Sequence, residues 1–169
     1  MHGAGITSAP GYRIVENMKI CDVLQKETIL ADLKAQNKKG ILEELVAPVS
    51  EIANVNQEDL VKVLMERERL GSTGIGGGIG IPHGKMNEID SLVLGFGLSR
   101  NGVDFESLDG QPTHIFFLLI TPENSAGLHL KLLARISRIL KDDPFKSRLL
   151  NATNGDEIFD IIKEEDEEF

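Results

Sequence analysis

The chain has 169 residues, of which 41% are apolar and 27% are charged, and its formal net charge is −9. This length and composition are typical of one globular domain with a sizeable core. The negative charge argues against a nucleic-acid-binding protein, which needs a basic surface. Since no apolar run approaches the ~20 residues of a membrane-spanning helix, we expect no membrane insertion.

The sequence has a single cysteine, Cys21, which therefore cannot form an internal disulfide. Single cysteines without disulfide partners are typical of reducing compartments. The N-terminus also lacks the basic start and long apolar stretch of a secretory signal. We therefore expect a cytoplasmic protein in which Cys21 is a packed or semi-exposed spectator thiol.

The first half of the chain predicts one strand followed by two helices. The strand is expected over residues 29–33, and apolar residues at helical spacing predict a helix over residues 38–52. Pro48 lies inside this helix and removes a backbone donor, so we expect a kink or a break there. Asn56 is a typical N-cap for the second helix, which we expect to end at Gly71.

The second half predicts further strands and three helices. Strands are expected over residues 91–98 and 114–120. Between them we expect a turn at residues 99–102, which contains an Asn-Gly signal, and a second loop at residues 108–112. A long helix with an amphipathic apolar stripe is expected to open at residues 122–125. A short helix begins at Pro144, and a last helix with an apolar face follows it.

These elements follow the order β-α-α-β-β-β-α-α-α. This order indicates an α/β (α+β) protein with a single domain, in which a mixed β-sheet is sandwiched by helices. The domain is expected over residues 18–163. Residues 1–17, rich in small residues and without periodicity, are predicted to be a flexible leader. Residues 164–169 are predicted to be a solvated acidic tail, because runs of like charge usually face water.

The most informative segment is residues 70–85, with the sequence LGSTGIGGGIGIPHGK, in which six glycines precede His83. Glycine lets backbone amides approach a ligand closely, and histidine is a nucleophile and proton shuttle near neutral pH. We interpret the segment as a flexible loop that handles an anion. Phosphate is the natural candidate because loop amides bind it well. The alternative is a glycine-rich surface loop with an incidental histidine.

Two kinds of nucleotide-binding loop are excluded by spacing. A Walker A loop, counted back from Gly84, requires glycine at position 79 and a hydroxyl residue at position 86, but the chain has Ile79 and Met86. The dinucleotide fingerprint Gly-x-Gly-x-x-Gly fails in every register of the run. The glycines therefore serve a histidine rather than a nucleotide.

Two further residues are candidates for the same site. His129 lies in the first turns of the long helix, on its apolar side, and is either a half-buried structural histidine or a hydrogen-bonding partner of His83 and its phosphate. Arg67 ends the helix that leads into the glycine-rich run, and is either a solvated charge or a clamp for phosphate oxygens. His114 begins an apolar strand and is expected to be structural. Since the four histidines lack metal-ligand spacing, we expect no metal site.

Three segments carry recognisable motifs: residues 68–85 (ERLGSTGIGGGIGIPHGK), residues 104–112 (DFESLDGQP) and residues 129–134 (HLKLLA). Together they resemble the fructose/mannitol-type enzyme IIA domain of the bacterial phosphotransferase system. The sequence GSTGIGGG at residues 71–78 is most similar to the nitrogen-regulatory branch of that family. The resemblance covers about residues 21–163. One departure is Gly80, where the family usually has alanine.

The resemblance implies a phosphoryl carrier that receives phosphate from the phosphohistidine of HPr or of its nitrogen-branch counterpart. His83 takes the role of the nucleophile, His129 a supporting role, and Arg67 the role of the arginine at the edge of the site. No metal or other cofactor is implied, because positioning and amide donors do most of the catalysis. The predicted phosphate-binding residues of the glycine-rich run are Thr73, Gly74 and Gly84.

Three functions stay open at this point. The first is a regulatory phosphocarrier whose phosphorylation state controls other proteins. The second is a sugar-transport enzyme IIA that passes phosphate to an enzyme IIB. The third is a binding module without phosphotransfer, which the presence of both His83 and His129 argues against.

Overall fold

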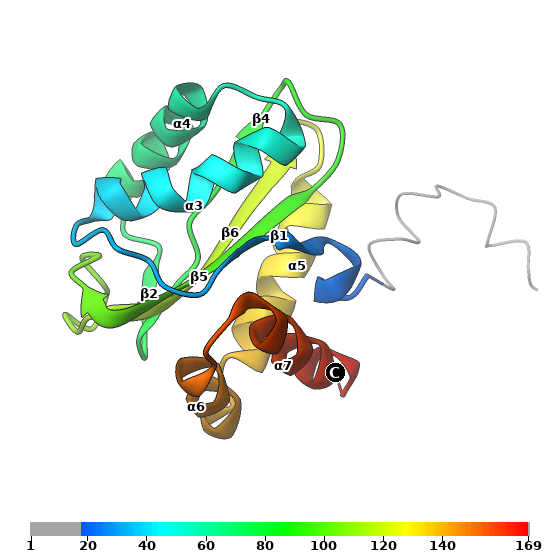
Figure 1. Ribbon diagram of the computed structural model, residues 1–169. Coiled ribbons are helices and arrows are strands. Elements are labelled where there is room, and N and C mark those ends of the chain that lie inside the picture. Colours follow the sequence, from blue (N-terminus) through cyan, green and yellow to red (C-terminus); the bar gives the residue numbers. More distant parts are fainter. Residues whose placement is uncertain (1–17, 169) are drawn as a thin grey trace, which may run out of the picture.

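A six-stranded sheet with helices on both faces forms the framework of the molecule (Figure 1). The computed structural model describes residues 18–168. The strands are β1 (Leu24–Leu30), β2 (Gly74–Gly76), β3 (Ile79–Gly80), β4 (His83–Met86), β5 (Val93–Val103) and β6 (Thr113–Pro122). The helices are the short 3-10 helix η1 (Ile20–Asp22), α3 (Lys38–Ala53), α4 (Gln57–Arg69), α5 (Ala126–Ile139), α6 (Asp143–Asn151) and α7 (Gly155–Glu167). Within this described part of the chain, every helix is too short or too polar to cross a bilayer.

The sheet mixes parallel and antiparallel pairs. Its strands lie in the order β1-β5-β6-β3-β2, and β4 also pairs with β6. The pairing of β5 with β6 is antiparallel, whereas β1 runs parallel to β5, and both β3 and β4 run parallel to β6. The predicted class, a mixed sheet between helical layers, is confirmed. The predicted order has three strands between the second and third helices, but the structure has five, because the glycine-rich run forms β2, β3 and β4.

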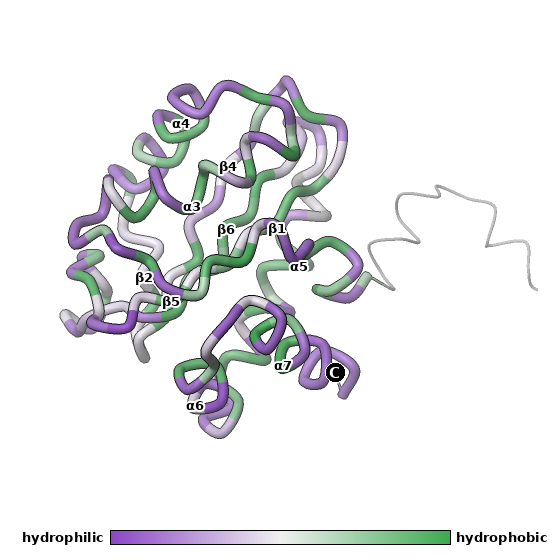
Figure 2. The backbone as a smooth tube through the Cα atoms, in the orientation of Figure 1, coloured by the Kyte–Doolittle hydropathy of each residue, from purple (hydrophilic) through white to green (hydrophobic). Residues whose placement is uncertain are grey.

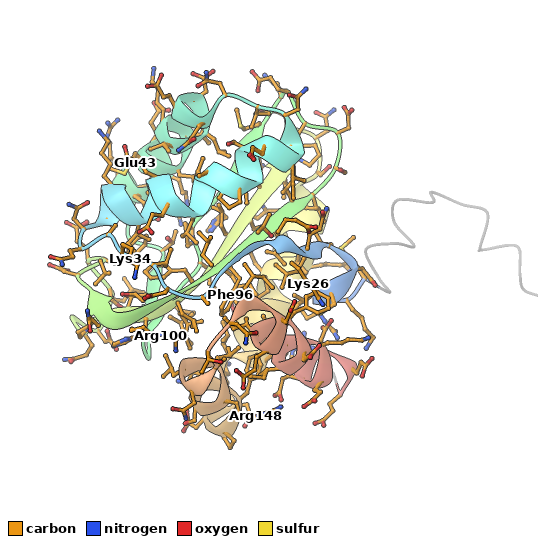
Figure 3. The ribbon with its side chains drawn as sticks, viewed as in Figure 1. Lys26, Lys34, Glu43, Phe96, Arg100 and Arg148 are labelled. Carbon is orange, nitrogen blue, oxygen red and sulfur yellow. The ribbon has the colours of Figure 1, made fainter. Side chains whose placement is uncertain are left out.

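The central strand β6 separates two apolar layers, since successive side chains of a strand point to opposite faces. Figure 2 shows apolar residues along the central strands and polar residues on the outer turns of the helices. In Figure 3, Phe96 of β5 is labelled on the sheet and belongs to one of these layers, whereas Glu43 and Arg148 point outward from their helices. The buried residues of β6 divide between the layer under α5, α6 and α7 (Ile115, Phe117 and Leu119) and the layer under α3 and α4 (Phe116, Leu118 and Ile120).

Pro48 does not break α3, so of the two predicted alternatives, a kink or a break, the break is wrong. The helix is uninterrupted over Lys38–Ala53 with the proline inside it. A proline in a helix interior costs about 3 kcal/mol. Leu45 and Val49 are at most 1% exposed on either side of it, and burying each such side chain stabilises the fold by about 1.5–3 kcal/mol. Packing against the sheet therefore outweighs the lost backbone hydrogen bond.

Two strand boundaries also differ from the sequence prediction. β1 begins five residues before the predicted position 29, because the three exposed residues in its middle, 25–27, obscure the apolar pattern. The predicted turn at residues 99–102 is wrong, since β5 continues through it to Val103. A shift in the pairing register between Leu98 and Val103 absorbs the extra residues. The connection to β6 lies instead within residues 104–112.

The predicted acidic tail at residues 164–169 is largely helix. α7 extends to Glu167, and its inner face buries Asp166 to 1% exposure. The Asp166 carboxylate accepts hydrogen bonds from Arg135 Nε of α5 at 2.8 Å and from the Cys21 backbone amide at 3.1 Å. The run is therefore not solvated throughout, because one of its charges holds α7 against α5 and η1. Burial also raises the pKa of the Cys21 thiol to about 11, which keeps it protonated at neutral pH. The predicted leader, residues 1–17, lies outside the described residues.

We expect Glu165→Gln to stabilise the protein at pH 8 and to leave it unchanged at pH 4. Burial, and next the carboxyl of Asp142, raise the pKa of Glu165 from 4.5 to about 7, with a further small rise from Glu168 and an opposing effect of Arg148. The folded state therefore holds a proton that the unfolded chain has lost between about pH 4.5 and 7. The stability contributed by this group falls as pH rises through that window.

The expected gain at pH 8 is about 1–3 kcal/mol in the free energy of unfolding. Urea unfolding of the wild type and the variant at both pH values measures it. Glu164→Gln is the matched control, because Glu164 is exposed and pairs with Arg148 at 2.6 Å. An equal effect of Glu165→Gln at pH 4 and pH 8 would contradict the explanation.

Candidate functional site

The glycine-rich run folds as a hairpin followed by a strand. β2 and β3 pair antiparallel, and the last residue of β2, Gly76, and the two turn residues, Gly77 and Gly78, all have positive φ angles. Residues other than glycine rarely adopt such angles, so three consecutive glycines suit this turn. The chain then continues into β4, which starts at His83. The segment that the sequence predicts as a loop is therefore ordered by strand pairing.

The segment of residues 104–111 holds this hairpin in place. The Leu108 amide donates a hydrogen bond to the Gly74 carbonyl at 2.9 Å. The Gly77 amide at the hairpin turn donates to the carboxylate of Asp109 at 3.0 Å. Two sequence motifs that lie about thirty residues apart are thus joined by hydrogen bonds, and the hairpin that contains the glycines has a defined conformation.

His83 lies at the start of β4, where it pairs with Leu119 of β6, and its side chain is half-buried. Its Nδ1 lies 2.8 Å from the Ile81 carbonyl oxygen. Because a carbonyl can only accept, Nδ1 carries the proton and the lone pair of the neutral ring is on Nε2. Burial lowers the pKa of His83, the bond to Ile81 opposes this, and the nearby charge of Arg67 lowers it further. The ring is therefore neutral and nucleophilic at physiological pH.

His129 stands beside His83. The two ring centroids are 4.7 Å apart, and the rings meet edge to face at 72°. His129 comes from α5, is 7% exposed, and has its Nδ1 3.3 Å from the Thr121 hydroxyl at the end of β6. Burial is the main cause that lowers the pKa of His129 to about 4, followed by the charge of a protonated His83 and then by the positive charges of Lys85 and Arg67. Both rings are thus neutral before any reaction.

Two cationic side chains act on this pair. Arg67 lies in the last turn of α4 and donates from Nη1 to the Gly71 carbonyl at 2.9 Å, and its positive charge lowers the pKa of both histidines. Lys85 acts on His129 and was not found from the sequence. It lies two residues after His83 in β4, so strand alternation places the two side chains on the same face. That signal existed in the sequence, but it required recognising β4 as a strand.

The predicted phosphate donors Thr73 and Gly74 are engaged within the protein. The Thr73 amide donates to Oε1 of Glu68 at 3.2 Å, and the Thr73 hydroxyl donates to Oε2 of the same carboxylate. The Gly74 amide donates to the hydroxyl oxygen of Ser72 at 3.0 Å. A phosphate-binding role for Thr73 or Gly74 would require these bonds to be exchanged.

Two further glycines, Gly84 and Gly80, lie in closely packed positions. A Cβ atom at Gly84 would lie 2.9 Å from Cγ1 of Val63, so only glycine lets β4 approach α4 this closely. A Cβ at Gly80, where the resembled family usually has alanine, would lie 3.1 Å from the ring of Phe116. The glycine at position 80 thus matches the tight packing of this chain against β6.

The site therefore presents a neutral imidazole with a free lone pair, a second neutral imidazole in contact with it, and two cations nearby. This arrangement suits attack on an electrophilic anion, because the nucleophile is unprotonated while the surroundings favour negative charge. A phosphoryl group fits both requirements.

Comparison with known proteins identifies the family. Residues 22–165 match the family described as "Phosphoenolpyruvate-dependent sugar phosphotransferase system, EIIA 2". The chain belongs to this enzyme IIA family. The match includes the glycine-rich run, the segment of residues 104–111 and both histidines of the site.

Relatives of the enzyme IIA chain come from two branches. It is 39% identical to a nitrogen regulatory protein of Bradyrhizobium diazoefficiens over 145 residues, which are 86% of this chain and 95% of the relative. It is also 37% identical to the fructose-specific EIIABC component of Bacillus subtilis, over 88% of this chain but only 24% of that larger protein. The crystal structure of the nitrogen regulatory protein IIA-Ntr from Neisseria meningitidis superposes with a TM-score of 0.80 at 29% identity, covering 85% of this chain and 98% of that one.

Proposed function

We propose that this enzyme IIA chain is a phosphoryl carrier in which Nε2 of His83 accepts the phosphoryl group of a phosphohistidine on an HPr-type protein. The observation that carries the proposal is the bond between Nδ1 of His83 and the Ile81 carbonyl, which leaves the lone pair on Nε2. Burial of the ring supports it, because the lowered pKa keeps this lone pair free at neutral pH. Membership of the family supplies the class of chemistry.

The proposed transfer is balanced without an added reactant. The Nε2 lone pair of His83 forms a new N–P bond while the N–P bond of the donor breaks, and that electron pair stays on the departing donor imidazole. The proton on Nδ1 of His83 remains in place throughout. The ring becomes positive when Nε2 is phosphorylated, and the Ile81 carbonyl stabilises this charge through the same hydrogen bond. Catalysis in such a step consists mainly of positioning and electrostatic stabilisation.

The neighbouring groups take complementary roles in this proposal. Arg67, whose charge reaches both histidines, stabilises the negative oxygens of the phosphoryl group. Lys85 adds a second positive charge on the same face of β4. His129 fixes the orientation of the His83 ring by edge-to-face contact, and is within reach of a phosphoryl group on it. Gly84 contributes by letting β4, and so His83, approach α4.

We assign the chain to a regulatory rather than a transport role, in a cytoplasmic location. The nitrogen regulatory relative from Bradyrhizobium is matched over nearly its whole length, which supports this assignment. The alternative is a sugar-transport enzyme IIA that passes phosphate to an enzyme IIB, and the similarity to a fructose-specific EIIABC component favours it. The two proposals share the chemistry at His83. They differ only in the partner of the phosphorylated protein, which is a regulated protein in the first and an enzyme IIB in the second.

The experiment is phosphorylation of the purified chain with phosphoenolpyruvate, enzyme I and HPr. We expect an intact-mass gain of one phosphoryl group that is lost in acid, as a phosphoramidate requires. Adding a fructose-type enzyme IIB to the phosphorylated protein then separates the two roles. Rapid transfer to IIB supports the transport alternative, whereas a stable phosphorylated chain supports the regulatory role. No mass gain with either HPr or its nitrogen-branch counterpart would contradict phosphotransfer altogether.

A further inference from the structure

We propose that Glu68 is a positioning residue that fixes the tautomer of His83 through a chain of hydrogen bonds running by way of Thr73 and Ile81. This inference rests on the proposed phosphotransfer at His83 for its functional meaning. Its geometric content, a defined proton position on one ring, does not depend on that function.

The first link is the carboxylate of Glu68, at the end of α4. Its side chain is 3% exposed and binds both donors of Thr73, the amide at 3.2 Å and the hydroxyl. Burying a carboxylate is costly unless it is paired and hydrogen-bonded. The partner is Lys38 of α3, whose Nζ lies 2.8 Å from Oε1, and which is itself only 12% exposed. A charged pair buried at this point therefore holds the turn between α4 and β2 in one conformation.

The second link runs through the backbone to the reactive ring. The Ile81 amide donates to the Thr73 carbonyl at 3.0 Å, and the Ile81 carbonyl accepts from Nδ1 of His83 at 2.8 Å. The position of the carbonyl that sets the tautomer of His83 thus depends on Thr73, and Thr73 is held by Glu68. Each residue in this series of hydrogen bonds, from Glu68 to His83, therefore bonds directly to the next.

The alternative is that the ion pair of Glu68 with Lys38 only stabilises the fold and has no effect on the His83 ring. Variants of Thr73 and Glu68 distinguish this alternative from the proposed positioning role. Thr73→Val keeps the shape of the side chain and the backbone amide but removes the hydroxyl, and with it the hydrogen bond to Oε2 of Glu68. Glu68→Gln removes the charge. We expect both to let the Ile81 carbonyl drift, and the proton of His83 then spreads over Nδ1 and Nε2.

The readouts are the ring ¹⁵N shifts of His83, which report the tautomer, and the rate of phosphorylation by phosphorylated HPr. In the wild type we expect the proton on Nδ1. In Thr73→Val and Glu68→Gln we expect a mixed tautomer and a rate about 10- to 100-fold lower, the usual cost of a small misplacement of a reacting group. Thr73→Ser keeps the hydroxyl, and we expect it to restore both readouts.

Glu106→Gln is the matched control. Glu106 binds the same Lys38 at 2.9 Å, but its side chain is 75% exposed, so its loss should change neither readout. A wild-type tautomer and rate in Thr73→Val would overturn the inference, whatever the behaviour of Glu68→Gln. A wild-type protein that takes up no phosphate would contradict the proposed function, while the ¹⁵N shifts would still decide this inference.

Discussion

His83→Ala should abolish phosphorylation of this chain by an HPr-type donor. The neutral imidazole of His83 carries its lone pair on Nε2, because Nδ1 donates to the Ile81 carbonyl. A methyl group offers no nucleophile, and the loss should therefore be complete rather than partial. Intact-mass measurement after incubation with phosphoenolpyruvate, enzyme I and HPr should show one acid-labile phosphoryl group on the wild type and none on the variant.

His114→Ala is the control for this experiment. His114 is half-buried on β6, and its Nδ1 also binds a carbonyl, that of Ser99, at 2.9 Å, but this histidine is not part of the site. We expect this variant to be phosphorylated like the wild type, provided that it remains folded. Phosphate uptake by His83→Ala equal to that of the wild type would show that another residue is the nucleophile, and His129 would be the first to examine.

The sequence predicts the general architecture well because its signals are local. The apolar run at residues 114–120 indicates a buried central strand, and the structure places it in the middle of the sheet. Asn56 caps α4 as expected, with its side chain accepting from the Asp59 amide. Such signals depend only on a few neighbouring residues, so they can be interpreted from the sequence without knowledge of tertiary contacts.

The errors arise where tertiary contacts override local signals. Pro48 breaks an isolated helix, but α3 is held by packing on both sides of it. An acidic run normally faces water, but Asp166 is buried because Arg135, in another helix, is placed to pair with it. The glycine-rich run has no strand pattern of its own, and it becomes strands because β6 offers an edge for pairing.

The residues of the site also divide into those with a local sequence signal and those that depend on tertiary contacts. His83 and His129 are found from the glycine-rich run and the helical position of the second histidine, with the family resemblance joining them. Glu68 gives no such signal, because a glutamate near a helix end is ordinarily solvated. Only the folded chain shows that Lys38, thirty residues earlier, makes its burial possible. The sequence likewise gives no sign that Thr73 bonds Glu68, and its predicted phosphate-binding role stays a prediction.

His129→Ala should slow phosphorylation of His83 by about 10²–10⁴-fold, the usual effect of losing a positioned acid–base or orienting group. The ring of His129 contacts that of His83 edge to face at 4.7 Å, so its removal frees the nucleophile to turn and leaves the phosphoryl group without this neighbour. The nucleophile itself remains, and slow transfer should therefore persist. Rapid-quench phosphotransfer from labelled HPr measures the rate.

His129→Gln tests which property of the ring matters. Glutamine retains a hydrogen-bond donor but not the aromatic edge that meets His83, so recovery of the rate would assign the effect to hydrogen bonding. A rate as low as that of His129→Ala would assign it to ring packing. Because His129 is 7% exposed, thermal unfolding of both variants must be measured in parallel. A wild-type rate in a folded His129→Ala protein would make this residue a packed helix-start histidine with no part in the transfer.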